Sequence, residues 1–438
     1  MRGLEAIDPY ISAVRRGPDL TLGLSDTALA RRPAGTTPQA AADSVAALFA
    51  EAERQSPALR RAGRQAMLQA GFEEVFNHLD PYSRYLTPPE AQRGRERHLG
   101  ASDLGLTLAP GRRGEVTIGA IVPGSAADRA GLRRGDRVTA ADGIALDAED
   151  MDEAHAVLEG PPGSSVLLSV RRGRRRVDVL LTRAAAPQLS VTAQVRDGIL
   201  WLTLPLFSAT TPEQLDRALA ETPPSAAPLG IVLDLRGNRG GLLQQAIRVA
   251  DAFIPTGTIA FTDGRHIDSR RQFDTSGPDL AAGRRLIVLV DGRTASAAEV
   301  VAAAIGDLGR GVVVGSATMG KGLIQVLVPL PGGAQLALSW SRILAPRGWP
   351  LQMLGVLPAL CTSNGADATA RNIATLGTAD SPMTVPLARA RAARAPVPGS
   401  EIAALRGACP PAEGREADYA AARAVLEKPE LYEAALAR

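Results

Sequence analysis

The stretch LIVLVDGRTASAAEVVAAAIGDLG (286–309) contains a strand, a turn and a helix in direct succession. Its first five residues are all apolar, which is the length and composition of a buried strand. Ser296 then begins an Ala-rich helical segment that Gly309 ends. A hydroxyl at a helix N-terminus faces free amide groups and the positive end of the helix dipole. The stretch therefore predicts an α/β fold in which Ser296 lies where developing negative charge is stabilised.

The alternation of strands and helices extends from residue 195 to about 345, which predicts an α/β layer. The expected strands are 199–204, 230–235, 286–290, 311–315, 323–330 and 335–344. The expected helices are 212–221, 242–253 and 296–308.

Residues 99–185 have a different pattern, because short β-type runs dominate there. The expected strands are 104–108, 116–122, 137–143, 165–172 and 177–182, and helical pieces are expected near 125–130 and at 149–158. The basic string RRGRRR (171–176) lies between two of these strands, so we interpret it as a solvated hairpin turn rather than a polyanion site.

The two ends of the chain are less regular. In residues 1–35, Gly, Pro and Arg break every periodic pattern, so this segment is expected to be irregular, whereas 38–56 and 59–79 have helical spacing. After residue 362 the chain is rich in Ala, Pro, Gly and Arg, and a helical pattern returns only at about 414–436.

These patterns predict an α/β multidomain protein. The expected parts are a helical N-terminal region at 1–98, a β-rich domain with two helices at 99–185, an α/β core at 186–358, and an Ala/Pro/Arg-rich linker with C-terminal helices at 359–438.

Charge and hydropathy argue against several classes of protein. A net charge of +3 on 438 residues gives no reason to expect nucleic-acid binding. No stretch approaches the roughly 20 apolar residues that span a bilayer. The first residues, MRGLEAIDPY, lack the pattern of a signal peptide, so the protein is either cytosolic or exported by a signal that was removed.

The two cysteines, Cys361 and Cys409, lie in the C-terminal quarter. Two unreactive thiols and a disulfide are about equally compatible with their spacing, and a disulfide would suit an exported protein. They do not form a metal signature, because no His or second Cys pair lies at ligand spacing. We expect no metal and no cofactor.

Residues 99–185 resemble a PDZ domain of the type embedded in carboxyl-terminal processing peptidases. The resemblance rests on LGL (104–106), VPGSAADRAGLRRGDRVTAADG (122–143) and DEAHAVLEGPPGSSVLLSV (152–170). In such domains a peptide adds as a strand to the sheet edge, and loop amides bind its terminal carboxylate. The resemblance implies a carboxylate pocket formed by Leu104, Gly105, Leu106 and Thr107. His155, on the helix beside the groove, either contacts the ligand or faces solvent.

Three further segments resemble, in order, the catalytic core of the carboxyl-terminal processing (tail-specific) serine peptidase family. They are IVLDLRGNRGGLL (231–243), VDGRTASAAEVVAAAI (290–305) and VVGSATMGKGLIQVLVPL (313–330). The family's nucleophile, the first serine of S-A-S-E, matches Ser296, and its base, the lysine of F-G-K-G, matches Lys321. Gln325 follows Lys321 at the family's interval of four residues. The resemblance covers roughly residues 60–358 and implies a crotonase-like core.

A lysine can act as a base only if its pKa falls below the usual value of about 10.4. Met319 and Leu323 flank Lys321, so we expect burial to lower that pKa, and Gln325 can bind the amine without adding charge. In a flat strand the Cα atoms of Lys321 and Gln325 would be roughly 13 Å apart, so the chain must curl at Gly322 or Lys321 must bend back.

For the oxyanion hole we expect the amide of Ala297 and one amide of the GG turn, Gly240 or Gly241, where backbone without side chains can approach a substrate. Glu299 is interpreted as supporting the first helical turn. Departures from the family pattern include Ala298, Met319 and Arg239 and the phrases after residue 339, but none removes a named catalytic atom.

The leading hypothesis is a serine endopeptidase that cleaves unfolded or flexible proteins, guided by apolar C-terminal residues in the PDZ groove and gated by the PDZ domain or the N-terminal helices. One alternative is a PDZ adaptor whose peptidase core is idle, and another is a hydratase-like enzyme. Protein or peptide substrates are the expected partners, without nucleic acid or a membrane span. A homo-oligomer through the N- or C-terminal helices stays open, and the family resemblance implies export to the periplasm or cell envelope.

Overall fold

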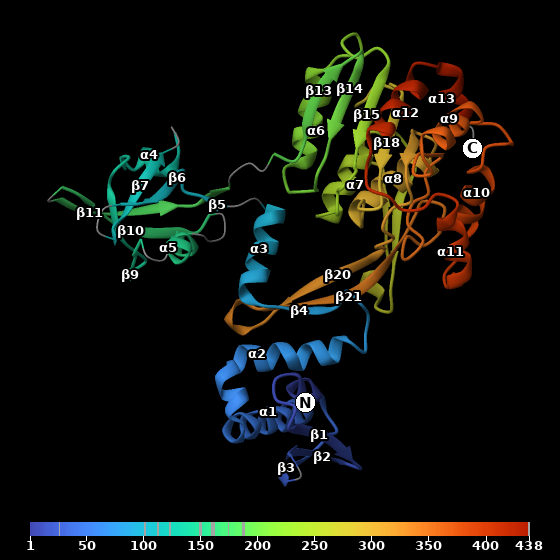
Figure 1. The fold of residues 1–438 in the computed structure, drawn as a ribbon. Coiled ribbons are helices and arrows are strands. Elements are labelled where there is room, and N and C mark those ends of the chain that lie inside the picture. The colour runs from blue at the N-terminus through green and yellow to red at the C-terminus, as the bar shows by residue number, and fades with distance from the viewer. Residues whose placement is uncertain are drawn as a thin grey trace. The chain divides into compact units, whose positions relative to one another are not determined.

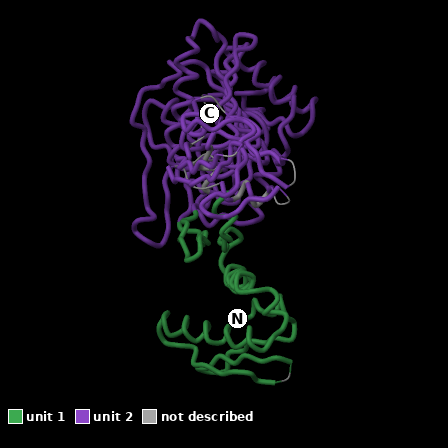
Figure 2. Tube along the Cα trace, turned by 90° about the vertical axis from the view of Figure 1, so that its left-hand side faces the viewer, with its two compact units in different colours: residues 1–93, 325–340 green, residues 94–324, 341–438 purple. Residues whose placement is uncertain are grey.

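The computed structural model describes residues 1–25, 27–99, 102–111, 114–121, 124–148, 151–158, 163–173, 175–185 and 189–436. Contacts divide the chain into two compact units, which Figure 2 shows in different colours. The first comprises residues 1–93 and 325–340, and the second comprises 94–324 and 341–438. The finer domain boundaries predicted from the sequence stay predictions.

The first unit begins with an antiparallel meander of three strands. Its elements are η1 (Arg2–Ala6), β1 (Ile11–Arg16), β2 (Asp19–Leu24) and β3 (Thr27–Pro33). The prediction that residues 1–35 are irregular was therefore wrong, and the expected helical N-terminal region also contains a sheet. Gly17 and Pro18 fall in the turn between β1 and β2, and the arginines of these strands are exposed. None of these residues therefore interrupts the face of the sheet that buries Ile11 and Leu22.

Two helices and a short strand complete the first unit, with part of a hairpin from later in the chain. Their bounds are α1 (Pro38–Gln55), α2 (Pro57–Phe76), β4 (Arg84–Leu86), β20 (Leu323–Pro329), η4 (Pro331–Gly333) and β21 (Gln335–Leu344). Ser56 ends α1 and caps α2, because its hydroxyl accepts a hydrogen bond from the Leu59 amide (3.1 Å). β4 pairs with β21, and Phe72 stacks on Phe76 and Tyr85. Helix α3 (Pro88–Leu99) continues into the second unit.

The segment predicted to be a PDZ domain forms an antiparallel sheet with two helices (Figure 1). Its elements are β5 (Ser102–Asp103), β6 (Leu106–Pro110), β7 (Val116–Ile121), α4 (Ala126–Arg129), β8 (Arg137–Ala141), β9 (Ile144–Ala145), α5 (Met151–Leu158), β10 (Ser165–Arg172), β11 (Arg175–Thr182) and β12 (Ala184–Ala185). The strand order β11–β10–β8–β7–β6 leaves β6 at an edge. Strands β10 and β11 pair as the predicted hairpin, with Arg171 opposite Arg176 and Arg172 opposite Arg175. Arg172 in it is not merely solvated, because it donates to the buried carboxylate of Asp136 (2.7 Å).

The core of the second unit is a six-stranded sheet in the order β13–β14–β15–β18–β19–β22. Its strands are β13 (Thr192–Arg196), β14 (Ile199–Thr203), β15 (Gly230–Asp234), β18 (Leu286–Val290), β19 (Val312–Gly315) and β22 (Leu360–Cys361). All neighbours are parallel except β13 and β14. One face packs on helices α6 (Thr211–Glu221), α7 (Leu243–Asp251) and α8 (Ala297–Asp307), and the other on C-terminal helices (Figure 1). Beside it, β16 (Thr258–Asp263) pairs with β17 (Arg271–Asp274) and with the end of β21, and η3 (Ile267–Ser269) joins β16 to β17.

The C-terminal part is more helical than predicted. Its helices are α9 (Ala366–Ala374), α10 (Thr384–Ala392), α11 (Gly399–Gly407), α12 (Glu416–Leu426) and α13 (Pro429–Leu436). The first three occupy the stretch expected to be a linker, so that expectation was wrong. Each has only nine residues, and the Pro and Gly residues between them obscure the helical periodicity in the sequence. Helices this short are stabilised mainly by packing on the core. The helices expected at about 414–436 are present as α12 and α13.

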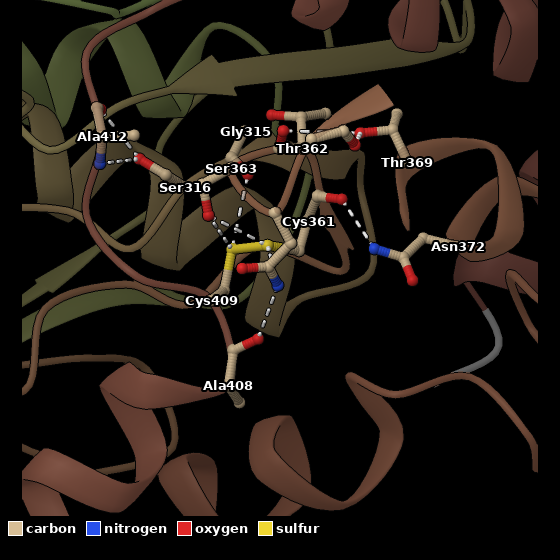
Figure 3. The surroundings of a disulfide bond; sticks show 12 residues. Gly315, Ser316, Cys361, Thr362, Ser363, Thr369, Asn372, Ala408, Cys409 and Ala412 are labelled. Atoms are coloured by element: carbon tan, nitrogen blue, oxygen red, sulfur yellow. Dashed lines mark hydrogen bonds between the residues drawn. A yellow bond between two sulfur atoms is a disulfide. The ribbon is translucent and has the colours of Figure 1, made fainter. Parts of the chain in front are cut away.

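The two cysteines form a disulfide between Cys361, at the end of β22, and Cys409, which follows α11 (Figure 3). The sequence left thiols and a disulfide equally open, and the structure decides for the disulfide. In the ranges that the structure describes, no helix is long and apolar enough to cross a membrane, and no group of three or more His, Cys, Asp or Glu could hold a metal ion.

Candidate active site

Ser296 follows the carboxyl end of β18 and is the N-cap residue of α8. Its φ of +58° and ψ of −121° are rare for a residue with a side chain and cost about 1–3 kcal/mol, so the surrounding structure must hold them. Asp291 organises the turn before the serine, because its Oδ1 accepts hydrogen bonds from the amides of Gly237 (2.9 Å) and Thr294 (2.9 Å). The candidate nucleophile thus occupies a strained and well-supported turn at a helix N-terminus.

The predicted glycine turn lies directly against Ser296. A Cβ atom on Gly240 would lie 3.0 Å from the Cβ of Ser296 and 3.1 Å from the nitrogen of Ala297. Gly240 also has a φ of +98°, which side chains disfavour. The structure therefore brings together Ser296, Ala297 and Gly240, and their roles as nucleophile and oxyanion donors stay predictions.

Buried Asn238 shapes this turn. Its Oδ1 accepts a hydrogen bond from the Gly240 amide (2.8 Å), and its Nδ2 donates to the Leu204 carbonyl (2.7 Å). Its own carbonyl accepts a hydrogen bond from the Ala295 amide (2.9 Å), which connects the turn to the serine loop. Because the Gly240 amide is engaged by Asn238, the Gly241 amide is the better candidate for an oxyanion donor.

A buried carboxylate connects the loops of Ser296 and Lys321. Glu299 Oε2 accepts hydrogen bonds from the backbone amides of Ser296 (2.7 Å) and Lys321 (2.9 Å). Its Oε1 accepts from the Gly320 amide (2.7 Å) and from the Thr318 hydroxyl. Burial raises the pKa of the Glu299 carboxyl above its ordinary value, while these four hydrogen bonds act in the opposite direction. Glu299 thus does more than support a helical turn, since it fixes both predicted catalytic residues to one group.

The backbone on both sides of Lys321 is also fixed. The Gly320 carbonyl accepts a hydrogen bond from the Met353 amide (2.8 Å), and the Gly322 amide donates to Oε1 of Gln352 (2.9 Å). A Cβ atom on Gly322 would lie 2.2 Å from the Gln352 nitrogen, so only glycine fits there. The loop that carries the candidate base is therefore held between Glu299 and the segment around Gln352.

Gln325 belongs to the first unit, whereas Ser296 and Lys321 belong to the second. Its side-chain amide donates to the carbonyl of Tyr82, which lies between α2 and β4. The predicted contact of Gln325 with Lys321, and the curl at Gly322 on which it depends, stay predictions.

Sequence reasoning missed the bridging role of Glu299 and the parts played by Asn238 and Gln352. An Asn beside glycines is ordinary turn chemistry, and a glutamate in the first turn of a helix is an ordinary favourable charge. Neither carries a signal that separates these roles from the common ones. Gln352 lies in a phrase that departs from the family pattern, so nothing in the sequence drew attention to it.

The predicted carboxylate loop, residues 104–107, leads into the edge strand β6. Gly105 has a φ of +73°, and a Cβ atom there would lie 1.9 Å from the Cβ of Ser125. The Ser125 hydroxyl donates to the Gly105 carbonyl (3.3 Å). The loop is thus fixed beside an edge to which a strand can add. The side chain of His155 lies outside the described residues.

Comparison with known proteins gives two matches to family models. Residues 198–360 match the model of peptidase family S41, and residues 117–172 match a PDZ domain. The chain is 34% identical over 297 residues to a carboxyl-terminal-processing protease of Synechocystis sp., covering 65% of this chain and 69% of that protein. It is 30% identical over 300 residues to a carboxy-terminal-processing protease of Bartonella bacilliformis, covering 67% of this chain and 69% of that protein. A solved structure of a photosystem II D1 C-terminal processing protease is 26% identical, covers 75% of this chain and 90% of that chain, and has a TM-score of 0.41.

These findings define the protein as a serine-type peptidase with a PDZ domain. The chain belongs to the family of carboxyl-terminal-processing proteases. The predicted family and enzyme class are thereby confirmed, and the mixed α/β fold with a PDZ domain agrees with them. The crotonase-like shape of the core stays a prediction.

Proposed function

We propose that the protein is an endopeptidase that cleaves flexible or unfolded protein chains, with Ser296 as nucleophile and Lys321 as general base. The observation that carries the proposal is the shared carboxylate of Glu299, which accepts hydrogen bonds from the amides of both residues. One buried group thereby sets the separation of the two loops that must act together.

The lysine content supports the role of Lys321. Of the 49 basic residues only two are lysines, Lys321 and Lys428. Arginine stays protonated in proteins, whereas a lysine can lose its proton and act as a base. A chain that uses arginine almost everywhere else but has lysine at the family's base position is consistent with a need for proton transfer there.

In the proposed reaction the neutral amine of Lys321 takes the hydroxyl proton as Ser296 Oγ bonds to the scissile carbonyl carbon. The amides of Ala297 and Gly241 stabilise the oxyanion. Collapse of this intermediate breaks the C–N bond, and the proton passes from Lys321 to the leaving amine. Water then attacks the acyl-enzyme, again with Lys321 as base, and restores the serine. Gln325 would orient the lysine, and its hydrogen bond to Tyr82 would fix the glutamine.

We propose further that the PDZ domain binds the apolar C-terminus of the substrate along β6, with the amides of loop 104–107 around its carboxylate. The edge position of β6 supports this mode. Export to an oxidising compartment is supported by the disulfide, because such bonds persist mainly outside the cytosol.

The test uses an unstructured polypeptide with an apolar C-terminus as substrate. The parent and Lys428→Arg are expected to cleave it, whereas Ser296→Ala and Lys321→Arg are expected to be inactive. Arginine at position 321 is a basic side chain of similar length, but it stays protonated and so cannot take the proton from Ser296. Cleavage by Lys321→Arg at the parent rate would contradict the mechanism, and a parent that binds the substrate without cleaving it would favour the adaptor alternative.

A further inference from the structure

We propose that Arg406, on the C-terminal helix α11, is a positioning residue for the loop of Lys321, and that the Cys361–Cys409 disulfide keeps it in place. The proposal rests on the proposed function, because it concerns the loop of the proposed base. It assigns a role in the active site to the C-terminal segment, which lies outside residues 198–360 that match the peptidase family.

Arg406 joins two segments that flank the base loop. Its Nη1 donates to the carbonyls of Thr318 (2.8 Å) and Leu354 (2.9 Å). Thr318 lies three residues before Lys321, and Leu354 follows Met353, whose amide donates to the Gly320 carbonyl (2.8 Å). The guanidinium of Arg406 therefore binds both of the segments, around Thr318 and around Leu354, that hold the backbone of Lys321.

Glycine at position 355 makes this contact geometrically feasible. A Cβ atom on Gly355 would lie 2.8 Å from both the Arg406 Nη1 and the Thr318 oxygen. The φ of Gly355 is +69°, a value that side chains disfavour. The site is therefore shaped so that the arginine can enter between Thr318 and the 354–355 turn.

Thr318 carries the effect of Arg406 to Glu299. It is fully buried, its hydroxyl donates to the Glu299 carboxylate, and that hydroxyl accepts a hydrogen bond from the Val356 amide (2.7 Å). A shift of the Thr318 carbonyl would thus also shift a donor of the carboxylate that holds Ser296. Burial lowers the pKa of Arg406, and the negative charge of Glu299 acts in the opposite direction.

The disulfide joins the end of α11 to the central sheet. Cys409 lies three residues after Arg406, and Cys361 pairs in register with Gly315 of β19 (Figure 3). The Cys409 carbonyl also accepts a hydrogen bond from the Ala317 amide (3.3 Å), directly before Thr318. Both sulfur atoms belong to buried residues, so the bond acts as a fixed constraint rather than as an exposed switch.

The same segment continues toward the nucleophile. Ala412 accepts a hydrogen bond from the Gly292 amide (2.7 Å), in the turn before Ser296, and from the Ser316 hydroxyl (3.0 Å). Residues 406–412 therefore run along both loops that carry the proposed catalytic pair. Helix α11 itself buries Ile402 and Leu405, and the disulfide adds a covalent restraint two residues beyond its end.

The test compares peptide cleavage by the parent, Arg406→Met and Arg406→Lys. Met keeps much of the side-chain volume and removes the hydrogen bonds, so we expect kcat to fall about 10- to 100-fold through misplacement of the loop, with KM within about twofold of the parent. Arg406→Lys, which can still donate hydrogen bonds, is expected to have a higher kcat than Arg406→Met. The matched control is Arg389→Met, which removes the exposed ion pair between Arg389 and Glu401 of α11 and is expected to keep kcat within about twofold.

A second set of variants tests the disulfide. Cys361→Ala with Cys409→Ala is expected to lower kcat in the parent background and to add little in the Arg406→Met background, because both changes displace the same group. The unfolding temperature of each variant is determined by circular dichroism, and all rates are measured below it. An Arg406→Met variant with the parent kcat would overturn the proposal, and independent, additive losses would overturn the role of the disulfide. Ser296→Ala, assayed alongside, shows separately whether the proposed function itself fails.

Discussion

Substitution of Asn238 by Asp changes one nitrogen atom to oxygen at the centre of the glycine turn. In the protein the Nδ2 atom donates to the Leu204 carbonyl over 2.7 Å, and the residue is fully buried. A carboxylate would place a negative oxygen against that carbonyl oxygen without water between them, which is strongly unfavourable. The introduced carboxyl can avoid this only by binding a proton, which restores a donor.

The cost of that proton can be worked out. An aspartic acid kept protonated costs about 1.36 kcal/mol for each pH unit above its usual pKa of about 3.9. At pH 7 this amounts to about 4 kcal/mol, a large part of the roughly 5–15 kcal/mol that stabilises a typical domain. The folded-state pKa of the introduced carboxyl is raised, so the loss of stability relative to the parent is smallest below about pH 4 and grows as the pH rises.

Urea unfolding of parent and Asn238→Asp between about pH 5 and pH 8 measures this effect. We expect the difference in unfolding free energy to grow by up to about 1.4 kcal/mol per pH unit. Cleavage should fall in parallel, because Gly240 of the same turn lies against Ser296. The control is Asn77→Asp at the exposed C-cap of α2, where no such slope is expected. A difference between parent and Asn238→Asp that stays constant across this pH range would refute the reasoning.

Two further predictions concern buried carboxylates. Glu299→Ala removes the group that connects the amides of Ser296 and Lys321, so kcat is expected to fall about 100-fold. Glu213→Ala, which changes an exposed residue in the first turn of α6, should leave kcat unchanged. Equal rates for the two variants, measured at matched folded fraction, would contradict the bridging role. The hydrogen bond from Arg172 lowers the pKa of Asp136, so Asp136 stabilises the PDZ domain at neutral pH and this contribution is lost as the pH falls below about 4. In Asp136→Asn the acid dependence of the unfolding midpoint should be weaker, and an unchanged dependence would show that another group is responsible.

Secondary structure was predicted most accurately from the sequence where one physical pattern dominates. The five apolar residues of β18 and the helix after Ser296 appear where strand length and Ala content placed them. The meander at residues 11–33 was missed because its strands are largely exposed and contain arginines, and Gly17 and Pro18 looked like interruptions although they form a turn. The helices between residues 366 and 407 were missed for a related reason, since their stability comes from packing on the core rather than from local propensity.

The sequence named candidate site residues, whose catalytic roles stay predictions, but it did not reveal the groups that hold them in place. Ser296, Ala297 and Gly240 could be named from motif order, and the structure brings them together. The bonds from Glu299 to the loop of Lys321, and from Arg406 to Thr318, join residues far apart in the sequence. Such long-range hydrogen bonds leave no periodic trace, so only the folded chain reveals them.

Helix α8 illustrates how the nucleophile motif itself should be interpreted in other sequences. Ten of its eleven residues are buried, among them Ala298, which stands where the family pattern has a second serine. Small side chains are required there because larger ones would overpack the space between helix and sheet. Selection for packing alone can therefore preserve the Ala-rich string after the serine, even in a descendant that no longer cleaves anything. In surveys of related chains, Lys321 and the Gly240 turn are thus better indicators of retained peptidase activity than the helix that follows the serine.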